Sequence, residues 1–134
     1  MFTTAYGGKA MLLKIGRAGD QFSVTDVWSD NTQGYMSTPV FIGGHAYLHL
    51  KNQRFTCIDL RSGERKWTSQ TFGKYCSLVA NGDRILALDQ RGDLLLIRAT
   101  PEKFDLLGER KVADDSTWAH LAVCGNEVFV RALN

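Results

Sequence analysis

The chain has 134 residues, enough to bury the core of one domain, and we expect residues 1–134 to form a single domain. Its formal net charge of +2 and the lack of any long Lys/Arg cluster argue against a nucleic-acid partner. No apolar stretch approaches the roughly 20 residues that a membrane-spanning helix needs. The residues after Met1 lack the basic start and long apolar run of a signal peptide, so the sequence leaves the cellular location open.

Short apolar segments separated by glycine-containing turns predict strands along the whole chain. No window of 11 residues carries the apolar stripe of a helix. Pro39 falls at an expected strand start and Pro101 in an expected turn, where the missing N–H costs least. The expected strands cover residues 2–6, 10–16, 21–28, 38–42, 45–50, 54–59, 65–69, 77–81, 84–89, 94–99, 104–112, 119–124 and 127–133.

The expected hairpins recur at a nearly constant spacing. Gly44, Gly82 and Gly125 each lie in a turn between two apolar segments and are 38 and 43 residues apart. Trp28 precedes Trp67 by 39 residues, so the mean period is about 42 residues with four strands in each repeat. Such a repeat is typical of a β-propeller blade, and helical repeats of similar length need amphipathic helices that this chain lacks. An immunoglobulin-like sandwich is the alternative, but it does not explain the repeated turns.

The most distinctive segment covers residues 57–67, with the sequence CIDLRSGERKW. It resembles the PQQ-type repeat, whose pattern is A-x-D-x-x-T-G-x-x-x-W. Asp59, Gly63 and Trp67 match that pattern at the same spacing, and Ser62 replaces its threonine. We expect Asp59 and Ser62 to cap the turn, Gly63 to take the left-handed conformation, and Trp67 to pack between neighbouring blades.

The resemblance implies an all-β fold of four-stranded antiparallel blades, in a family whose members are mostly periplasmic or secreted. In the first repeat only Trp28 remains of the motif. Many proteins of this family resemble envelope assembly lipoproteins that bind protein partners. The quinone-dependent dehydrogenases of the family use an eight-bladed ring, a calcium or lanthanide ion and a catalytic aspartate, and none of those residues can be placed here. We therefore expect a non-enzymatic binding or assembly module without a cofactor; a fragment of a PQQ-dependent dehydrogenase is the alternative.

About three repeats are too few to close a ring, since propellers have about four to eight blades. The chain begins inside the second strand of one repeat and ends just after the second strand of another. We expect a homodimer that forms a six-bladed ring, in which residues 10–28 of one copy complete the blade begun by residues 119–133 of the other. The alternatives are a larger ring, pairing through the exposed strand edges, or a piece excised from a larger propeller.

Residues that could perform chemistry are few, and we expect no catalytic, cofactor-binding or metal-binding site. No nucleophile, base and acid set and no glycine-rich phosphate loop is present. His45 and His49 share one face of an expected strand, but a metal site needs further ligands. Residues 91–93, Arg-Gly-Asp, are expected to form a turn. An odd number of cysteines leaves at least one thiol unpaired and allows one disulfide; they are Cys57, Cys76 and Cys124.

The connections between repeats are the expected binding loops, because a propeller holds such loops rigidly. Tyr35, Tyr75 and Trp118 recur at or near the start of the first strand of each repeat. They could form an aromatic-lined surface, or they could pack between blades. Asp114 and Asp115 lie in the last connection and could face the opening of the ring.

Overall fold

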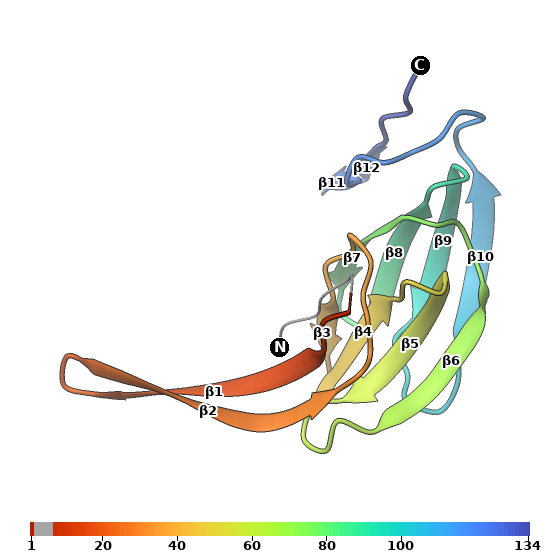
Figure 1. The fold of residues 1–134 in the computed structure, drawn as a ribbon. Helices are drawn as coiled ribbons and strands as arrows, with labels where there is room; N and C mark the ends of the chain where they lie inside the picture. The colour runs from red at the N-terminus through yellow and green to blue at the C-terminus, as the bar shows by residue number, and fades with distance from the viewer. Residues whose placement is uncertain (2–6) are drawn as a thin grey trace.

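The computed structural model describes Met1 and residues 7–134, and the strand expected at residues 2–6 lies outside that part of the chain. The described residues form strands only and include no helix that could cross a membrane (Figure 1). The strands are β1 (Ala10–Ala18), β2 (Gln21–Asp30), β3 (Val40–Ile42), β4 (His45–His49), β5 (Arg54–Asp59), β6 (Arg65–Thr71), β7 (Cys76–Asn81), β8 (Arg84–Asp89), β9 (Asp93–Arg98), β10 (Asp105–Lys111), β11 (Ala122–Cys124) and β12 (Glu127–Phe129).

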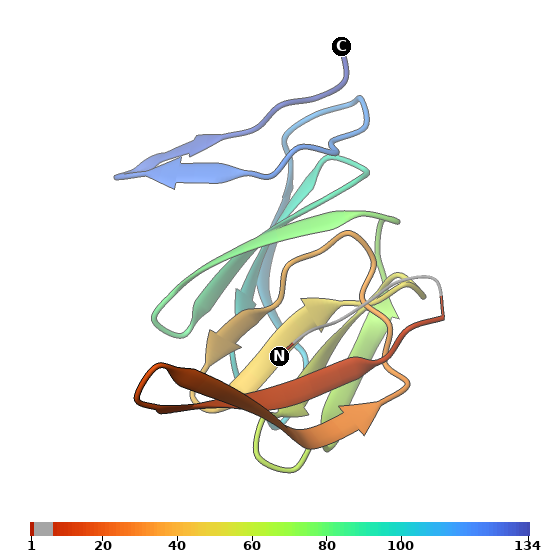
Figure 2. The same cartoon turned by 60° about the vertical axis from the view of Figure 1, so that its left-hand side comes forward.

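These strands form four separate antiparallel sheets. Two have four strands each, in the orders β3-β4-β5-β6 and β7-β8-β9-β10, and the pairs β1-β2 and β11-β12 form two-stranded sheets. Strands that are neighbours in sequence are neighbours in each sheet, so every sheet is a simple meander. Figure 2 shows the sheets following one another in chain order, from β1–β2 to β11–β12. The prediction of repeated four-stranded antiparallel sheets is confirmed.

The two hairpins depart from their expected lengths. β1 and β2 are 9 and 10 residues long, and their far end projects beyond the neighbouring sheet (Figure 1). By contrast, β11 and β12 have only three residues each, although residues 119–124 and 127–133 were expected to be strands. Hydrogen bonds to distant residues explain part of this shortening: Leu121 N–H bonds to Ser77 Oγ and Leu133 N–H bonds to the Ser116 carbonyl, so neither group is available for the hairpin ladder.

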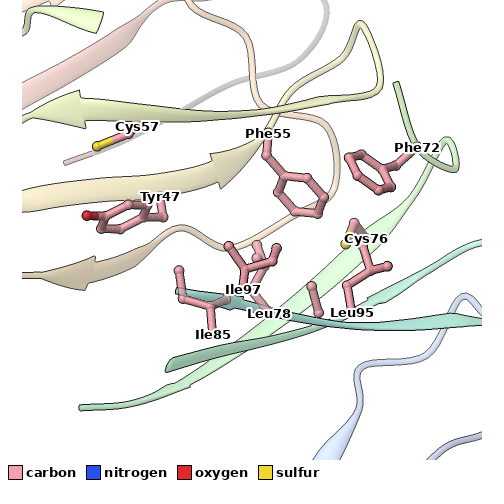
Figure 3. Close-up of a cluster of buried hydrophobic side chains, with 10 residues drawn as sticks. Tyr47, Phe55, Cys57, Phe72, Cys76, Leu78, Ile85, Leu95 and Ile97 are labelled. Atoms are coloured by element: carbon pink, nitrogen blue, oxygen red, sulfur yellow. The ribbon is translucent and has the colours of Figure 1, made fainter. Parts of the chain in front are cut away.

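The main core lies between the two four-stranded sheets (Figure 3). Tyr47 and Phe55 extend from the β3–β6 sheet and meet Ile85 and Leu95 of the β7–β10 sheet, all less than 4% exposed. Each such side chain contributes roughly 1.5–3 kcal/mol through the apolar area that it removes from water. Phe104 completes the cluster by stacking on Phe55, with ring centroids 5.9 Å apart.

The β3–β6 sheet is apolar on its other face as well. Leu48 and Ile58 are fully buried there, and Trp28 of β2 and Leu60 pack over them. A sheet covered on both faces by neighbouring sheets explains why β4 and β5 are almost continuously buried rather than alternating. This is the arrangement that stacked propeller blades require.

Candidate binding site

Three aromatic side chains from successive connections stand next to one another, and we call Tyr35, Tyr75 and Trp118 the aromatic row. The rings of Tyr35 and Tyr75 are stacked, with centroids 5.4 Å apart and an interplanar angle of 17°. The rings of Tyr75 and Trp118 lie 4.6 Å apart and are tilted by 49°. Residues that are about 40 positions apart in sequence are therefore in contact. The repeat brings them together because each lies shortly before a first strand.

Backbone hydrogen bonds fix these connections to the middle turns of the two four-stranded sheets. Lys51 N–H donates to the Gln33 carbonyl at 2.9 Å, in the turn between β4 and β5. In the turn between β8 and β9, Gln90 N–H donates to the Tyr75 carbonyl at 2.8 Å, and Thr117 N–H donates to the Gln90 carbonyl at 3.1 Å. The aromatic row consequently rests on paired backbone rather than on free loops.

Asp89 organises this end of the β7–β10 sheet. Its side chain is buried, and Oδ2 accepts the Gly73 N–H at 2.7 Å. Oδ1 accepts the N–H groups of Arg91 at 2.8 Å and Asp93 at 3.2 Å. The Thr117 hydroxyl donates to the Asp89 carbonyl, which ties the next connection to the same point. The carboxylate therefore holds the connection that carries Tyr75 to the turn between β8 and β9, and the Asp89 carbonyl holds the connection that carries Trp118.

A pocket of about 200 Å³ opens beside the row, and we call it the Trp118 pocket. Its lining is Met36, Tyr75, Cys76, Ser77, Thr117, Trp118, Ala119 and His120. Trp118 is 54% exposed, so part of its ring faces solvent at the mouth. Lys74 Nζ lies 5.9 Å from the ring centre of Tyr35 and 5.6 Å from that of Tyr75. The site thus combines aromatic faces, a small pocket and one cation.

Asp114 and Asp115 lie in the connection that leads to Trp118, and both are exposed. Ser116 accepts a hydrogen bond from the Leu133 N–H at 3.0 Å, which holds this connection against the end of the chain.

The motif at residues 57–67 forms the turn between β5 and β6. Asp59 Oδ1 accepts the N–H of Ser62 at 2.9 Å and that of Arg61 at 2.8 Å, and these bonds, the Ser62 one foremost, lower the pKa of the Asp59 carboxyl. Gly63 has a φ of 75°, and a Cβ there would lie 2.8 Å from Trp28 Cδ2. Ser62 Oγ accepts the N–H of Glu64 at 3.2 Å. Both the turn and the close approach of the tryptophan require glycine at position 63.

Trp28 and Trp67 occupy equivalent places in successive sheets. Trp28 Nε1–H donates to the Leu60 carbonyl at 2.8 Å, and Trp67 Nε1–H donates to the Thr100 carbonyl at 2.8 Å. In both cases a last-strand tryptophan bonds the last turn of the following sheet. Each tryptophan therefore links two sheets through ring burial and one hydrogen bond.

The two histidines of β4 lie in different environments and do not form a common site. His45 Nδ1 lies 2.9 Å from the Gly43 carbonyl, and its Nε2 lies 3.8 Å from Asp59 Oδ2. His49 is fully buried, and among the described residues neither of its ring nitrogens has a hydrogen-bond partner at normal geometry. Burial lowers the pKa of His49 to about 4, although the Asp89 carboxylate partly opposes that shift. Among the described residues, no group of three or more potential metal ligands comes together.

All three cysteines are free thiols. Cys57 and Cys76 are buried and Cys124 is exposed. Burial raises the pKa of Cys57 to about 11 and raises that of Cys76 well above its ordinary value. Neither buried thiol is therefore suited to act as a nucleophile.

The Arg-Gly-Asp segment, residues 91–93, is a packed turn rather than a projecting loop. Gly92 has a φ of 84°, and its carbonyl accepts the Val112 N–H at 2.9 Å. Arg91 reaches back to the Phe72 carbonyl at 3.2 Å. The contacts of this segment are thus with other parts of the same chain.

Two residues of the site, Asp89 and Lys74, were not predicted from the sequence. Asp89 was included only as the end of an expected strand, although an aspartate three residues before Gly92 is a signal for a capped turn. Lys74 was passed over because a lone lysine beside an aromatic residue has no distinctive spacing. Its place over two rings arises only when successive repeats meet.

No family model matches the chain. Over 61 residues, or 46% of the chain, it is 34% identical to the outer membrane protein assembly factor BamB of Salmonella typhimurium, and the match spans 15% of that protein. Among solved structures, the crystal structure of BamB from Moraxella catarrhalis is similar with a TM-score of 0.56 and 13% sequence identity. That similarity covers 79% of this chain and 38% of the Moraxella chain. The chain thus has an all-β fold of propeller blades, similar to that of BamB, and matches less than half of either relative.

Proposed function

We propose that this chain is a non-enzymatic scaffold that binds other proteins through the aromatic row. The observation that carries the proposal is the continuous contact of Tyr35, Tyr75 and Trp118, backed by paired backbone and bordered by a pocket. Exposed, rigid aromatic rings at a pocket are the features that dominate protein-binding surfaces.

The relatives support the same class of function. The Salmonella protein is an assembly factor for outer membrane proteins, and by analogy we propose that this chain acts in protein assembly at a bacterial envelope. Structural likeness at low identity says nothing of partners, so the partner must come from experiment.

Site-specific photo-crosslinking tests this function. A photoreactive amino acid is placed at Trp118, and at Arg110 of β10 as an exposed control away from the row, and the protein is irradiated with an envelope fraction. We expect an adduct with an identified envelope protein at position 118 and none at position 110. Equal adducts at both positions, or none at either, would refute the proposal. A PQQ titration followed by absorbance tests the dehydrogenase alternative, which requires saturable binding.

We also propose that two copies associate into a closed ring. Leu86 of β8 and Leu96 of β9 occupy the positions that Tyr47 and Cys57 hold in the preceding sheet. Tyr47 and Cys57 are buried under the next sheet, whereas Leu96 is 37% exposed. A groove of about 430 Å³ lies there, bordered by both leucines and by a residue of β11. The short β11–β12 hairpin leaves this face partly uncovered.

The β1–β2 hairpin of a second copy has the character needed to cover that face. It supplies the third and fourth strands of a blade of which β11–β12 supplies the first two. Its apolar side chains are mostly in solvent, with Phe22 69% and Val24 61% exposed. Joining the two half-blades would bury apolar surface on both partners.

Sedimentation velocity over a range of protein concentrations tests the ring. We expect a species of twice the chain mass that weakens when Leu96→Glu places a charge on the uncovered face. A monomer at every concentration would refute the ring, and a dimer unaffected by the substitution would refute this interface.

A further inference from the structure

We propose that the Trp118 pocket receives a proline side chain from an extended segment of a partner protein, and that Lys74 pairs with a carboxylate of the same segment. This inference rests on the protein-binding function proposed for the aromatic row, and it names the chemistry of the bound segment. Three features carry it: the size of the pocket, the arrangement of its rings, and a cation, Lys74, that forms no ion pair with any residue the structure describes.

The size of the pocket selects a side chain rather than a metabolite. Pockets for small organic ligands measure about 300–1,000 Å³. The Trp118 pocket, at about 200 Å³, is smaller than that and has room for one amino-acid residue of a bound segment. A partner would therefore insert one residue here and extend over the neighbouring rings.

The rings favour proline among the side chains that fit. Tyr75 and Trp118 both line the pocket, and their ring planes are tilted by 49°, so the two faces are not parallel. A compact pyrrolidine ring can contact both faces, and proline-rich segments dock on aromatic-lined grooves because they enter already extended. The nearly parallel Tyr35 and Tyr75 rings continue the surface beyond the pocket.

Charge defines the second contact. Lys74 Nζ lies over the faces of Tyr35 and Tyr75, and within the described part of the chain it forms no ion pair. His120, which also lines the pocket, is not an acidic side chain. A cation held on aromatic rings at the end of a binding surface is complementary to an acidic residue of a ligand.

The distances set the spacing between the two ligand residues. Lys74 Nζ is 5.6 Å from the Tyr75 ring centre, and that centre is 4.6 Å from Trp118. The cation therefore lies within about 10 Å of the opening, and an extended chain advances about 3.1–3.3 Å per residue. The acidic residue should stand two or three positions from the proline.

Peptide titrations monitored by NMR test the inference. The probe is acetyl-Glu-Ala-Pro-Ala-Glu-amide, which offers a carboxylate on either side of the proline, and the readout is the indole N–H signal of Trp118. We expect saturable binding that weakens at least 5-fold when the proline becomes alanine. Replacing both glutamates by glutamine should weaken binding about 2- to 5-fold at low salt, an effect that disappears at high salt.

Variants of the protein locate the binding. Trp118→Ala and Lys74→Gln should lower affinity at least 10-fold and about 2- to 5-fold respectively, read from backbone amide shifts near Tyr75. Phe41→Ala, which removes an exposed ring on β3, is the matched control and should leave affinity unchanged. Retained dispersion of the amide spectrum shows that each variant is folded.

Three results would overturn the inference: no saturable binding, equal binding of the alanine peptide, or full affinity of Trp118→Ala. Competition separates it from the broader proposal. If photo-crosslinking at position 118 captures an envelope protein that the peptide does not displace, the protein-binding function stands and the proline-acidic ligand is wrong. If no protein is captured at position 118, the binding function itself fails.

Discussion

His49 provides the sharpest test of how the two four-stranded sheets pack. The side chain is fully buried, and its ring meets Phe55 edge-on with centroids 5.1 Å apart. Burial lowers the pKa of His49 to about 4, compared with an ordinary value of 6.5. The Asp89 carboxylate favours the protonated form but does not outweigh the loss of solvation.

The sign and size of the change in stability with pH follow from the linkage between proton binding at His49 and folding. Below pH 6.5 the unfolded chain binds a proton at this histidine while the folded protein does not, so stability falls as the pH decreases. The loss continues until the folded pKa near 4 is reached. A difference of about 2.5 pKa units corresponds to about 3 kcal/mol, and the slope approaches about 1.4 kcal/mol per pH unit between those values. Asp30 and Asp59, whose pKa values are lowered from 3.8, act mainly at lower pH.

Urea unfolding followed by tryptophan fluorescence at pH 7.0, 6.0, 5.0 and 4.5 measures this slope, at one fixed protein concentration. We expect His49→Leu to lose most of the pH dependence and to unfold at pH 7 within about 1.5 kcal/mol of the unmodified protein, because Leu88 occupies the equivalent buried position of the next sheet. His120→Leu, at an exposed position, is the control and should keep the slope. If His49→Leu retains the full slope between pH 6.5 and 4.5, His49 is not a buried neutral side chain and the packing described here is wrong.

Three further predictions test other contacts. Trp67→Phe keeps a ring between the sheets but removes the N–H that bonds the Thr100 carbonyl, so it should cost about 1 kcal/mol in urea unfolding; no change would show that the hydrogen bond is not made. Gly92→Ala introduces a Cβ that would lie 2.1 Å from the Ala113 backbone oxygen, at a φ of 84°. It should destabilise the protein by at least about 1–2 kcal/mol more than Gly82→Ala, where no atom lies within 4 Å of the added Cβ. Equal effects would contradict the packed turn. A thiol reagent should label Cys124 at once and the two buried cysteines only on unfolding; simultaneous labelling of all three would contradict their burial.

The parts of the fold that the sequence predicts are those set by interactions between neighbouring residues. Apolar segments separated by turns, many of which contain glycine, locate the strands from β1 to β12, because turn geometry and strand alternation are properties of neighbouring residues. The ends of β11 and β12 could not be predicted in the same way. Their outer residues bond to Ser77 and Ser116, and such long-range partners have no local signal.

The candidate site shows the same division. The recurrence of Tyr35, Tyr75 and Trp118 before successive first strands is visible in the sequence, and the structure brings these three rings into contact. Asp89 and Lys74 were missed because their importance depends on contacts between repeats. The repeat period can be found in the sequence, but the surroundings of Asp89 and Lys74 form only when one sheet packs on the next.

The contact between successive connections is the central structural claim, and nuclear Overhauser effects between aromatic rings measure it most directly. We predict strong effects from the ring protons of Tyr75 to those of both Tyr35 and Trp118, since the ring centres lie 5.4 Å and 4.6 Å apart. Absence of both effects in a well-dispersed spectrum would show that the connections do not meet, and would contradict the stacked-blade arrangement and the binding site built on it.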